Sequence, residues 1–168
     1  MDCYTSDSSG SDSDASAERE RRTIDYAHLM LNEEEVQINL EEFVKQRVPS
    51  TIEIAILNNN RISKLPVVIS QFNNLRVLDL SGNRLTHLPT EITHLTQLQK
   101  LIAKNNQLNE DGLPKSLESW KILKDLNLSG NRFRTIPGQT FDLQSLKYLY
   151  LGGNQIQAIP KDVWKLKR

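Results

Sequence analysis

The sequence predicts an α/β fold, a solenoid in which short parallel strands form a curved sheet on the concave face. Three observations support this prediction. Five copies of one pattern recur at an almost constant spacing, an amphipathic segment precedes the first copy, and residues 1–17 are rich in serine and aspartate. We therefore divide the 168 residues into a disordered acidic tail (1–22), a helical N-terminal cap (23–49) and a repeat domain (50–168).

The tail is acidic and almost without apolar side chains. Residues 1–17 contain six serines and four aspartates and no lysine or arginine. Such a segment buries too little apolar surface to offset the entropy lost on ordering, so we expect disorder. It also lacks the apolar stretch of a secretory signal. Ser9 and Ser11 each precede an aspartate by three residues, a pattern that acid-directed kinases accept; the alternative is an unmodified solubilising tail.

The cap is predicted from a helix start signal and an apolar face. Asn32 followed by Glu35 has the spacing of a capping box. Downstream, four apolar residues fall on one side of a helix, namely Val36, Leu40, Phe43 and Val44. We expect this helix to pack on the first repeat and shield its core, because a solenoid exposes apolar surface at an uncapped end. The alternative is a helix that binds a partner.

The repeat is the most specific feature of the chain. Each copy begins with Leu-x-x-Leu-x-Leu or a close variant, continues with an asparagine, and ends in an apolar residue followed by proline. The copies begin at residues 52, 75, 98, 123 and 146, at steps of 23, 23, 25 and 23 residues. The longer step arises because residues 109–112 replace two residues of the other copies. Units of this length stack coil on coil, each contacting only its neighbours. No capping segment follows the fifth copy, and a sixth would begin at residue 169, so we expect the array to continue in a longer protein.

Each position of the repeat has a physical reason. Alternation in the leucine motif predicts a short strand whose leucines point into the solenoid and whose intervening residues point outward. The asparagine follows the strand at a turn, where its side chain can satisfy backbone groups that water does not reach. This predicts a structural column along the solenoid, formed by Asn60, Asn83, Asn106, Asn131 and Asn154.

The outward residues of the strands form the predicted concave face. A solvated sheet face should be mostly polar, yet several of these residues are apolar or aromatic, as at interfaces. The charged ones would orient a partner. The alternative is that β-branched and aromatic residues occupy these positions because they favour strands, and that the N-terminal cap covers Ile54 and Ile56. We predict a partner-binding surface formed by Ile54, Ile56, Val77, Asp79, Lys100, Ile102, Lys104, Asp125, Asn127, Tyr148 and Tyr150.

The motifs resemble those of a known class. Leu-Pro after the asparagine turn resembles the large intracellular class of leucine-rich-repeat proteins. Within it, residues 102–117 with their two-residue expansion, together with residues 126–131 and 150–154, resemble the family of leucine-rich repeat-containing protein 58. That family continues with further repeats and a cysteine-bearing segment. The resemblance implies a protein-binding scaffold or adaptor, and as an alternative a substrate-recognition subunit of a cullin-type ubiquitin ligase, whose ligase-binding segment would lie beyond residue 168.

Composition argues against other classes of function. Cys3 is the single cysteine, so no disulfide framework forms within the chain, and no apolar run reaches the roughly 18 residues of a membrane span. Basic and acidic residues balance at 21 each, without the basic stripe expected of a nucleic-acid-binding protein. The three histidines are scattered, and no nucleophile or phosphate-loop motif accompanies them. We expect a non-enzymatic cytoplasmic or nuclear protein without cofactor or metal, whose partner is another protein.

Overall fold

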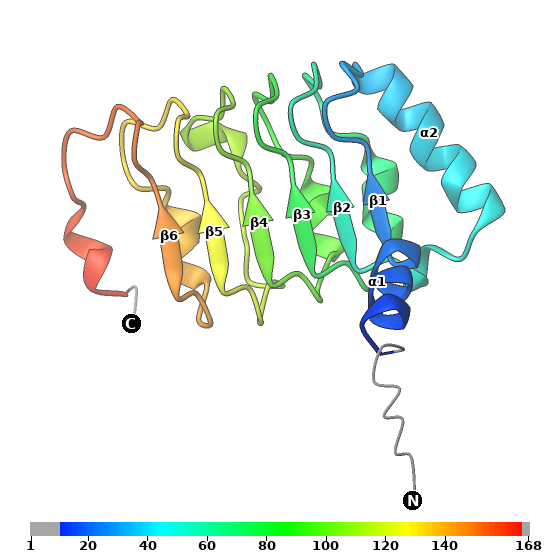
Figure 1. Cartoon of the computed structure of the whole chain (residues 1–168). Coiled ribbons are helices and arrows are strands. Elements are labelled where there is room, and N and C mark those ends of the chain that lie inside the picture. Colours follow the sequence, from blue (N-terminus) through cyan, green and yellow to red (C-terminus); the bar gives the residue numbers. More distant parts are fainter. Residues whose placement is uncertain (1–10, 166–168) are drawn as a thin grey trace, which may run out of the picture.

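A six-stranded parallel sheet forms one face of the molecule. The computed structural model describes residues 11–165, in which the strands follow one another in chain order from β1 to β6 (Figure 1). Each strand has three residues, and every neighbouring pair is parallel. The strands are β1 (Thr23–Asp25), β2 (Ile54–Ile56), β3 (Val77–Asp79), β4 (Lys100–Ile102), β5 (Asp125–Asn127) and β6 (Tyr148–Tyr150).

Short 3-10 helices form the convex return of the chain behind the sheet (Figure 1). Pro66, Pro89 and Pro137 stand at the N-cap positions of three of them, where a fixed φ and a missing N–H suit the start of a turn. The segments are η1 (Pro49–Thr51), η2 (Val67–Gln71), η3 (Thr90–His94), η4 (Glu110–Gly112), η5 (Gly138–Asp142) and η6 (Lys161–Lys165).

The core lies between these two layers and confirms the predicted alternation. The central residues of β2 to β5, such as Leu78 and Leu101, are fully buried, whereas the residues flanking them on each strand face outward. The convex layer supplies Ile92 and Trp120, which are also buried. Thr140 takes an apolar position of the pattern and is still fully buried, because its hydroxyl donates to the carbonyl oxygen of Pro137 at 2.7 Å.

The asparagine column joins each coil to the one before it. Asn83 donates to the carbonyl oxygen of Leu57 in the preceding coil and to that of Leu80 in its own, both at 3.0 Å. Its Oδ1 accepts the N–H of Ile62 at 3.1 Å. Equivalent bonds surround Asn60, Asn106, Asn131 and Asn154. The column therefore satisfies turn groups that the curved backbone leaves unpaired.

The two-residue expansion in the third repeat has a structural role. Glu110, in η4, accepts hydrogen bonds from the backbone N–H groups of Arg134 and Thr135 in the next coil. Gly112 packs against the preceding coil so closely that a Cβ atom would lie 2.6 Å from the carbonyl oxygen of Thr86. The added residues thus connect the coils on both sides.

The predicted cap is confirmed. Helix α2 (Glu33–Gln46) begins at Asn32 with both hydrogen bonds of a capping box, and acidic residues fill its first turn, where they favour the helix dipole. Val36 and Leu40 are fully buried in the same core as the repeats, and the ring of Phe43 lies 5.9 Å from that of Phe72. The helix therefore closes the first coil, which its apolar face predicted.

The structure differs from our expectation before residue 26. Within the tail predicted to be disordered, residues Ser11–Arg21 form helix α1, whereas residues 1–10 lie outside the described part. The second half of this helix, residues 17–21, consists of alanine, glutamate and arginine, which have good helix propensity, and Arg19 and Arg21 in the last turn favour the dipole. The region predicted as a helical cap also contains β1, whose Ile24 is buried and pairs with Ala55.

Candidate protein-binding face

The strand register brings the predicted contact residues together on one face. One column runs through the first residues of β2 to β6, Ile54, Val77, Lys100, Asp125 and Tyr148. A second column runs through the last residues of the same strands, Ile56, Asp79, Ile102, Asn127 and Tyr150. Lys104 lies just beyond β4 and is exposed. The sequence-based selection therefore corresponds to one continuous surface.

The N-terminal part of this face is bordered by α1. Ile54 and Ile56 are half-buried and line a hollow of about 370 Å³, together with Arg19 and Glu20 of α1 and with Asp25 of β1. Helix α1 is tied to the sheet through Arg22, which bridges Glu18 and Glu53. It is thus α1 and β1, rather than the cap helix, that adjoin Ile54 and Ile56.

Two of the predicted contact residues have partners within the fold. The carboxylate of Asp79 accepts from the backbone N–H of Ser81 at 2.9 Å, from its hydroxyl, and from the side-chain amide of Asn58 at 3.1 Å. Asn127 accepts from the N–H of Ser129 at 3.0 Å. Both side chains close the turn after their own strand, in the manner of an Asx turn. The carboxylate of Asp79 and the side-chain oxygen of Asn127 are therefore engaged by the fold itself.

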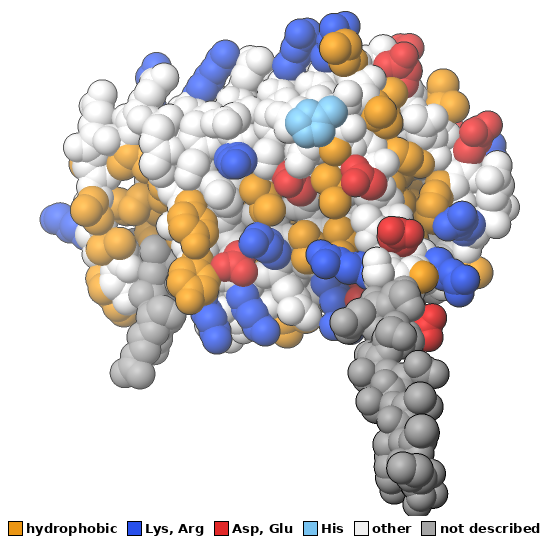
Figure 2. All heavy atoms as spheres, viewed as in Figure 1, with side chains coloured by type: hydrophobic (Ala, Val, Ile, Leu, Met, Phe, Trp, Pro, Cys, Tyr) orange, Lys and Arg blue, Asp and Glu red, His pale blue; other side chains and the backbone are white. Residues whose placement is uncertain are grey.

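The C-terminal part of the face presents an aromatic pair. The rings of Tyr148 and Tyr150 stack with centroids 6.4 Å apart and planes inclined by 17°. The two residues are 55% and 48% exposed, so about half of each residue faces solvent. Figure 2 shows basic side chains gathered along the lower edge of this face, near hydrophobic side chains. Exposed, prearranged aromatic residues are typical anchors of protein interfaces.

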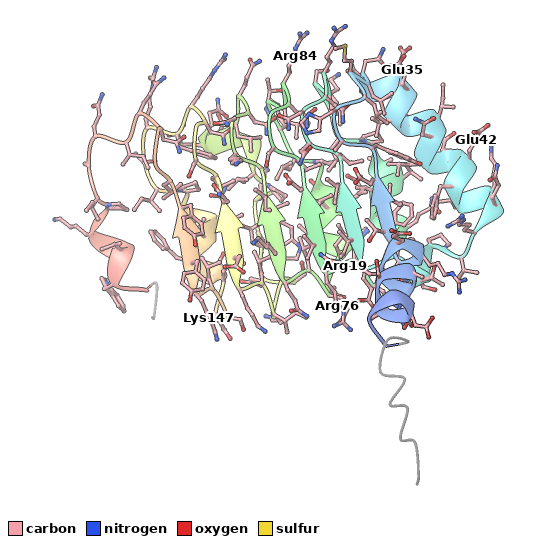
Figure 3. All side chains as sticks on the ribbon, in the orientation of Figure 1. Arg19, Glu35, Glu42, Arg76, Arg84 and Lys147 are labelled. Carbon is pink, nitrogen blue, oxygen red and sulfur yellow. The ribbon has the colours of Figure 1, made fainter. Side chains whose placement is uncertain are left out.

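Sequence reasoning missed the basic residues at the lower edge. Arg76, Lys124 and Lys147 each immediately precede a strand. They therefore form a column one residue before the first of the two columns of predicted contact residues. Figure 3 places Arg76 and Lys147 at this edge and Arg84 at the opposite one. They could have been found from the sequence by including the residue before each predicted strand, because its distance from the strand is the same in every repeat.

Four ionisable groups in the described part of the chain have a clearly shifted pKa, namely Arg22, Tyr26, Glu33 and Glu110. Burial raises the pKa of Tyr26. The pKa of Glu33 is lowered by hydrogen bonds, first from its own backbone N–H and then from the side chain and the backbone N–H of Ser63. Ion pairing and hydrogen bonding to Glu53 and Glu18 raise the pKa of Arg22. Over residues 11–165, no group of three His, Cys, Asp or Glu side chains is arranged to hold a metal ion.

A family model for the leucine-rich repeat matches residues 52–108 and 114–168, more than half of the chain. The chain belongs to the leucine-rich-repeat family. The parallel sheet and the asparagine column are therefore those of a leucine-rich-repeat domain, a family of interaction modules. No curated protein matches the chain. Among the described helices, none has the length and apolar character needed to cross a membrane.

Two solved structures share this architecture. A leucine-rich-repeat protein of Leptospira interrogans, LIC12759, is 38% identical over 70% of this chain, with a TM-score of 0.66. The ectodomain of the Arabidopsis thaliana membrane receptor kinase GASSHO1/SCHENGEN3, in complex with CASPARIAN STRIP INTEGRITY FACTOR 2, is 27% identical over 69% of this chain, with a TM-score of 0.56. The matches span 30% and 14% of those longer chains.

Proposed function

We propose that this leucine-rich-repeat domain is a non-enzymatic scaffold that holds a partner protein on its concave face. The exposed Tyr148–Tyr150 stack carries the proposal, because two large rings fixed against each other lose little conformational entropy on binding. Half-buried Ile102 and Val77 add apolar surface nearer the cap, beyond Asp125 and Asn127 of β5. The solved GASSHO1/SCHENGEN3 ectodomain, which is in complex with CASPARIAN STRIP INTEGRITY FACTOR 2, supports a binding role of the same kind.

Proximity labelling with two double variants tests the proposal. Ile102→Glu with Tyr150→Glu places charges on β4 and β6 of the concave face. Ile38→Glu with Val67→Glu makes the same chemical change at two residues that are each 57% exposed, on α2 and on the convex η2. We expect the first pair to remove specific partners and the second to retain them, with circular dichroism confirming that both fold. An unchanged partner list for the concave variant would refute this location.

A second candidate function is substrate recognition for a cullin-type ubiquitin ligase in the cytoplasm or nucleus. It is favoured by the resemblance of the expanded third repeat to the leucine-rich repeat-containing protein 58 family, and Glu110 and Gly112 give that expansion a structural role. A pull-down with a version extended by the further repeats of that family should recover cullin and adaptor subunits, whereas residues 1–168 alone should not. Absence of cullins from both would count against this function.

A further inference from the structure

We propose that the partner contacts the concave face through an acidic, extended peptide segment held by Lys100, Lys124, Lys147, Tyr148 and Tyr150. We call these five residues the Lys–Tyr surface. This inference rests on the proposed function and specifies the chemistry of the partner.

The backbone places the three lysines on successive coils. The N–H of Lys124 donates to the carbonyl oxygen of Gln99, next to Lys100, and the N–H of Lys147 donates to the carbonyl oxygen of Lys124, both at 2.8 Å. Strands bonded in this way lie about 4.8 Å apart. Lys124 and Lys147 are therefore direct neighbours at the lower edge, and Lys100 lies in the column that ends at Tyr148.

The positive charge of these lysines is not balanced within the described part of the chain. All three are exposed, and none forms an ion pair with a residue between 11 and 165. At the N-terminal end of the same edge the positive charges are balanced, because Glu53 pairs with both Arg22 and Arg76. Like charges on adjacent strands disfavour the fold, so this arrangement is one that an anionic ligand would stabilise. Asp125, the one acidic residue in the adjoining column, offsets only part of the charge.

The aromatic pair distinguishes a peptide from a simple anion. The stacked tyrosines adjoin Lys147 in sequence and offer a ring surface that inorganic phosphate does not need. An apolar side chain of a peptide can pack on these rings while carboxylates reach the lysines. Two coil steps span roughly 10 Å and three residues of extended chain span about the same, so acidic residues three apart would reach Lys100 and Lys147 together.

Selection from a random twelve-residue peptide library displayed on phage, with the whole 168-residue chain as bait, tests the proposal. We expect enrichment of Asp and Glu, with an apolar residue beside them. A synthetic fluorescein-labelled copy of the most enriched peptide is then titrated by fluorescence anisotropy at two salt concentrations. Its affinity should fall at higher salt, because exposed charge pairs are screened.

Charge reversal at opposite edges of the sheet provides the matched control. Lys124→Glu with Lys147→Glu should weaken binding about tenfold or more, since each reversal replaces an attraction by a repulsion. Arg84→Glu with Arg132→Glu changes the net charge equally at exposed residues that follow β3 and β5, and should weaken it less than about threefold. Tyr148→Ala should weaken binding, whereas Tyr148→Phe should preserve it.

Several results would overturn the inference. Enrichment of neutral or basic peptides would do so, as would equal loss in the two charge-reversed variants. A peptide released by Ile102→Glu with Tyr150→Glu, yet insensitive to the lysine reversals, would leave the concave-face function standing and refute the acidic partner. Insensitivity to both pairs would refute both. If deletion of residues 1–10 raised the affinity tenfold, the surface would belong to the acidic segment of the chain itself and not to a partner.

Discussion

Replacing Asn106 by alanine removes the central member of the asparagine column and should strongly destabilise the fold. The residue is 8% exposed. Its Nδ2 donates to the carbonyl oxygens of Leu80 at 2.9 Å and of Ala103 and Lys104 at 3.2 Å, and its Oδ1 accepts the N–H of Leu85 at 3.0 Å. The variant therefore loses every bond that joins these two coils through this side chain.

The magnitude follows from which groups remain paired. The three carbonyl oxygens keep partners, because Asn83, Asn131 and the N–H of Gly82 also donate to them. The N–H of Leu85 has no other acceptor in the described part of the chain. An orphaned buried N–H costs about 1–3 kcal/mol, and the two donor hydrogens contribute about 1 kcal/mol each. We expect a loss of about 3–5 kcal/mol, a large fraction of the roughly 5–15 kcal/mol of a typical domain.

Urea denaturation followed by circular dichroism measures this loss, and Asn154→Ala is the control. Asn154 makes similar bonds, to Leu128 at 2.9 Å, Leu151 at 2.8 Å and Phe133 at 3.1 Å, but it is only half-buried. Water can replace those bonds, so its loss should be less than half as large. Equal losses, or a loss below about 1 kcal/mol for Asn106→Ala at an unchanged m-value, would refute the reasoning.

Three further predictions concern single residues. Gly130→Ala should cost more stability than Gly153→Ala in thermal melts: both have φ near +70°, at 66° and 70°, but a Cβ on Gly130 would lie 2.2 Å from Oδ1 of Asn105, whereas Gly153 has nothing closer than 3.4 Å. Burial raises the pKa of Glu110, yet hydrogen bonds from its own N–H and those of Arg134 and Thr135 outweigh this and leave it lowered. The ionised carboxylate therefore stabilises the fold fully above the pKa of the unfolded state, and this stabilisation is lost as the pH falls through the lower pKa of the folded state. The difference in unfolding free energy between wild type and Glu110→Gln should shrink on acidification, and an increase in that difference would refute the direction of the pKa shift. Leu40→Ala, at a fully buried position of the cap, should cost about 2–5 kcal/mol in urea denaturation, and a cost below about 1 kcal/mol would mean that the cap is not integral to the core.

The solenoid is well predicted from the sequence because the leucine pattern within each repeat determines the register of its strand. Positions such as Leu78 and Leu101 fix the inward side of a strand, and a one-residue slip would turn them to solvent. Helix α2 is equally easy to predict from the sequence, since Asn32 and Glu35 mark its start. Strand β1 was missed because it has only Ile24 to bury, without the leucines that mark the other strands.

Features that depend on contacts between coils were harder to predict. Glu110 looks like one more polar residue of a loop, and only the packing of coil on coil brings it to Arg134 and Thr135. Asp79 was selected as a partner contact because its place on the strand is outward, whereas its carboxylate bonds Ser81 two residues later. The same position in β6 is Tyr150, which makes no such turn bond in the described structure and keeps its surface for solvent.

The two ends of the concave face differ in how far the fold satisfies its own side chains. Toward the cap, Asp79 closes a turn, Glu53 balances Arg22 and Arg76, and α1 borders the isoleucines of β2. Toward β6, the lysines lack ion pairs with described residues and the stacked tyrosines remain about half exposed. Because folding leaves charge and aromatic surface unsatisfied mainly at that end, a partner gains most by binding there. Substitutions at Tyr148 and Lys147 should therefore weaken binding more than substitutions at Ile54 or Asp79, which a direct comparison of the four single variants in the anisotropy titration would decide.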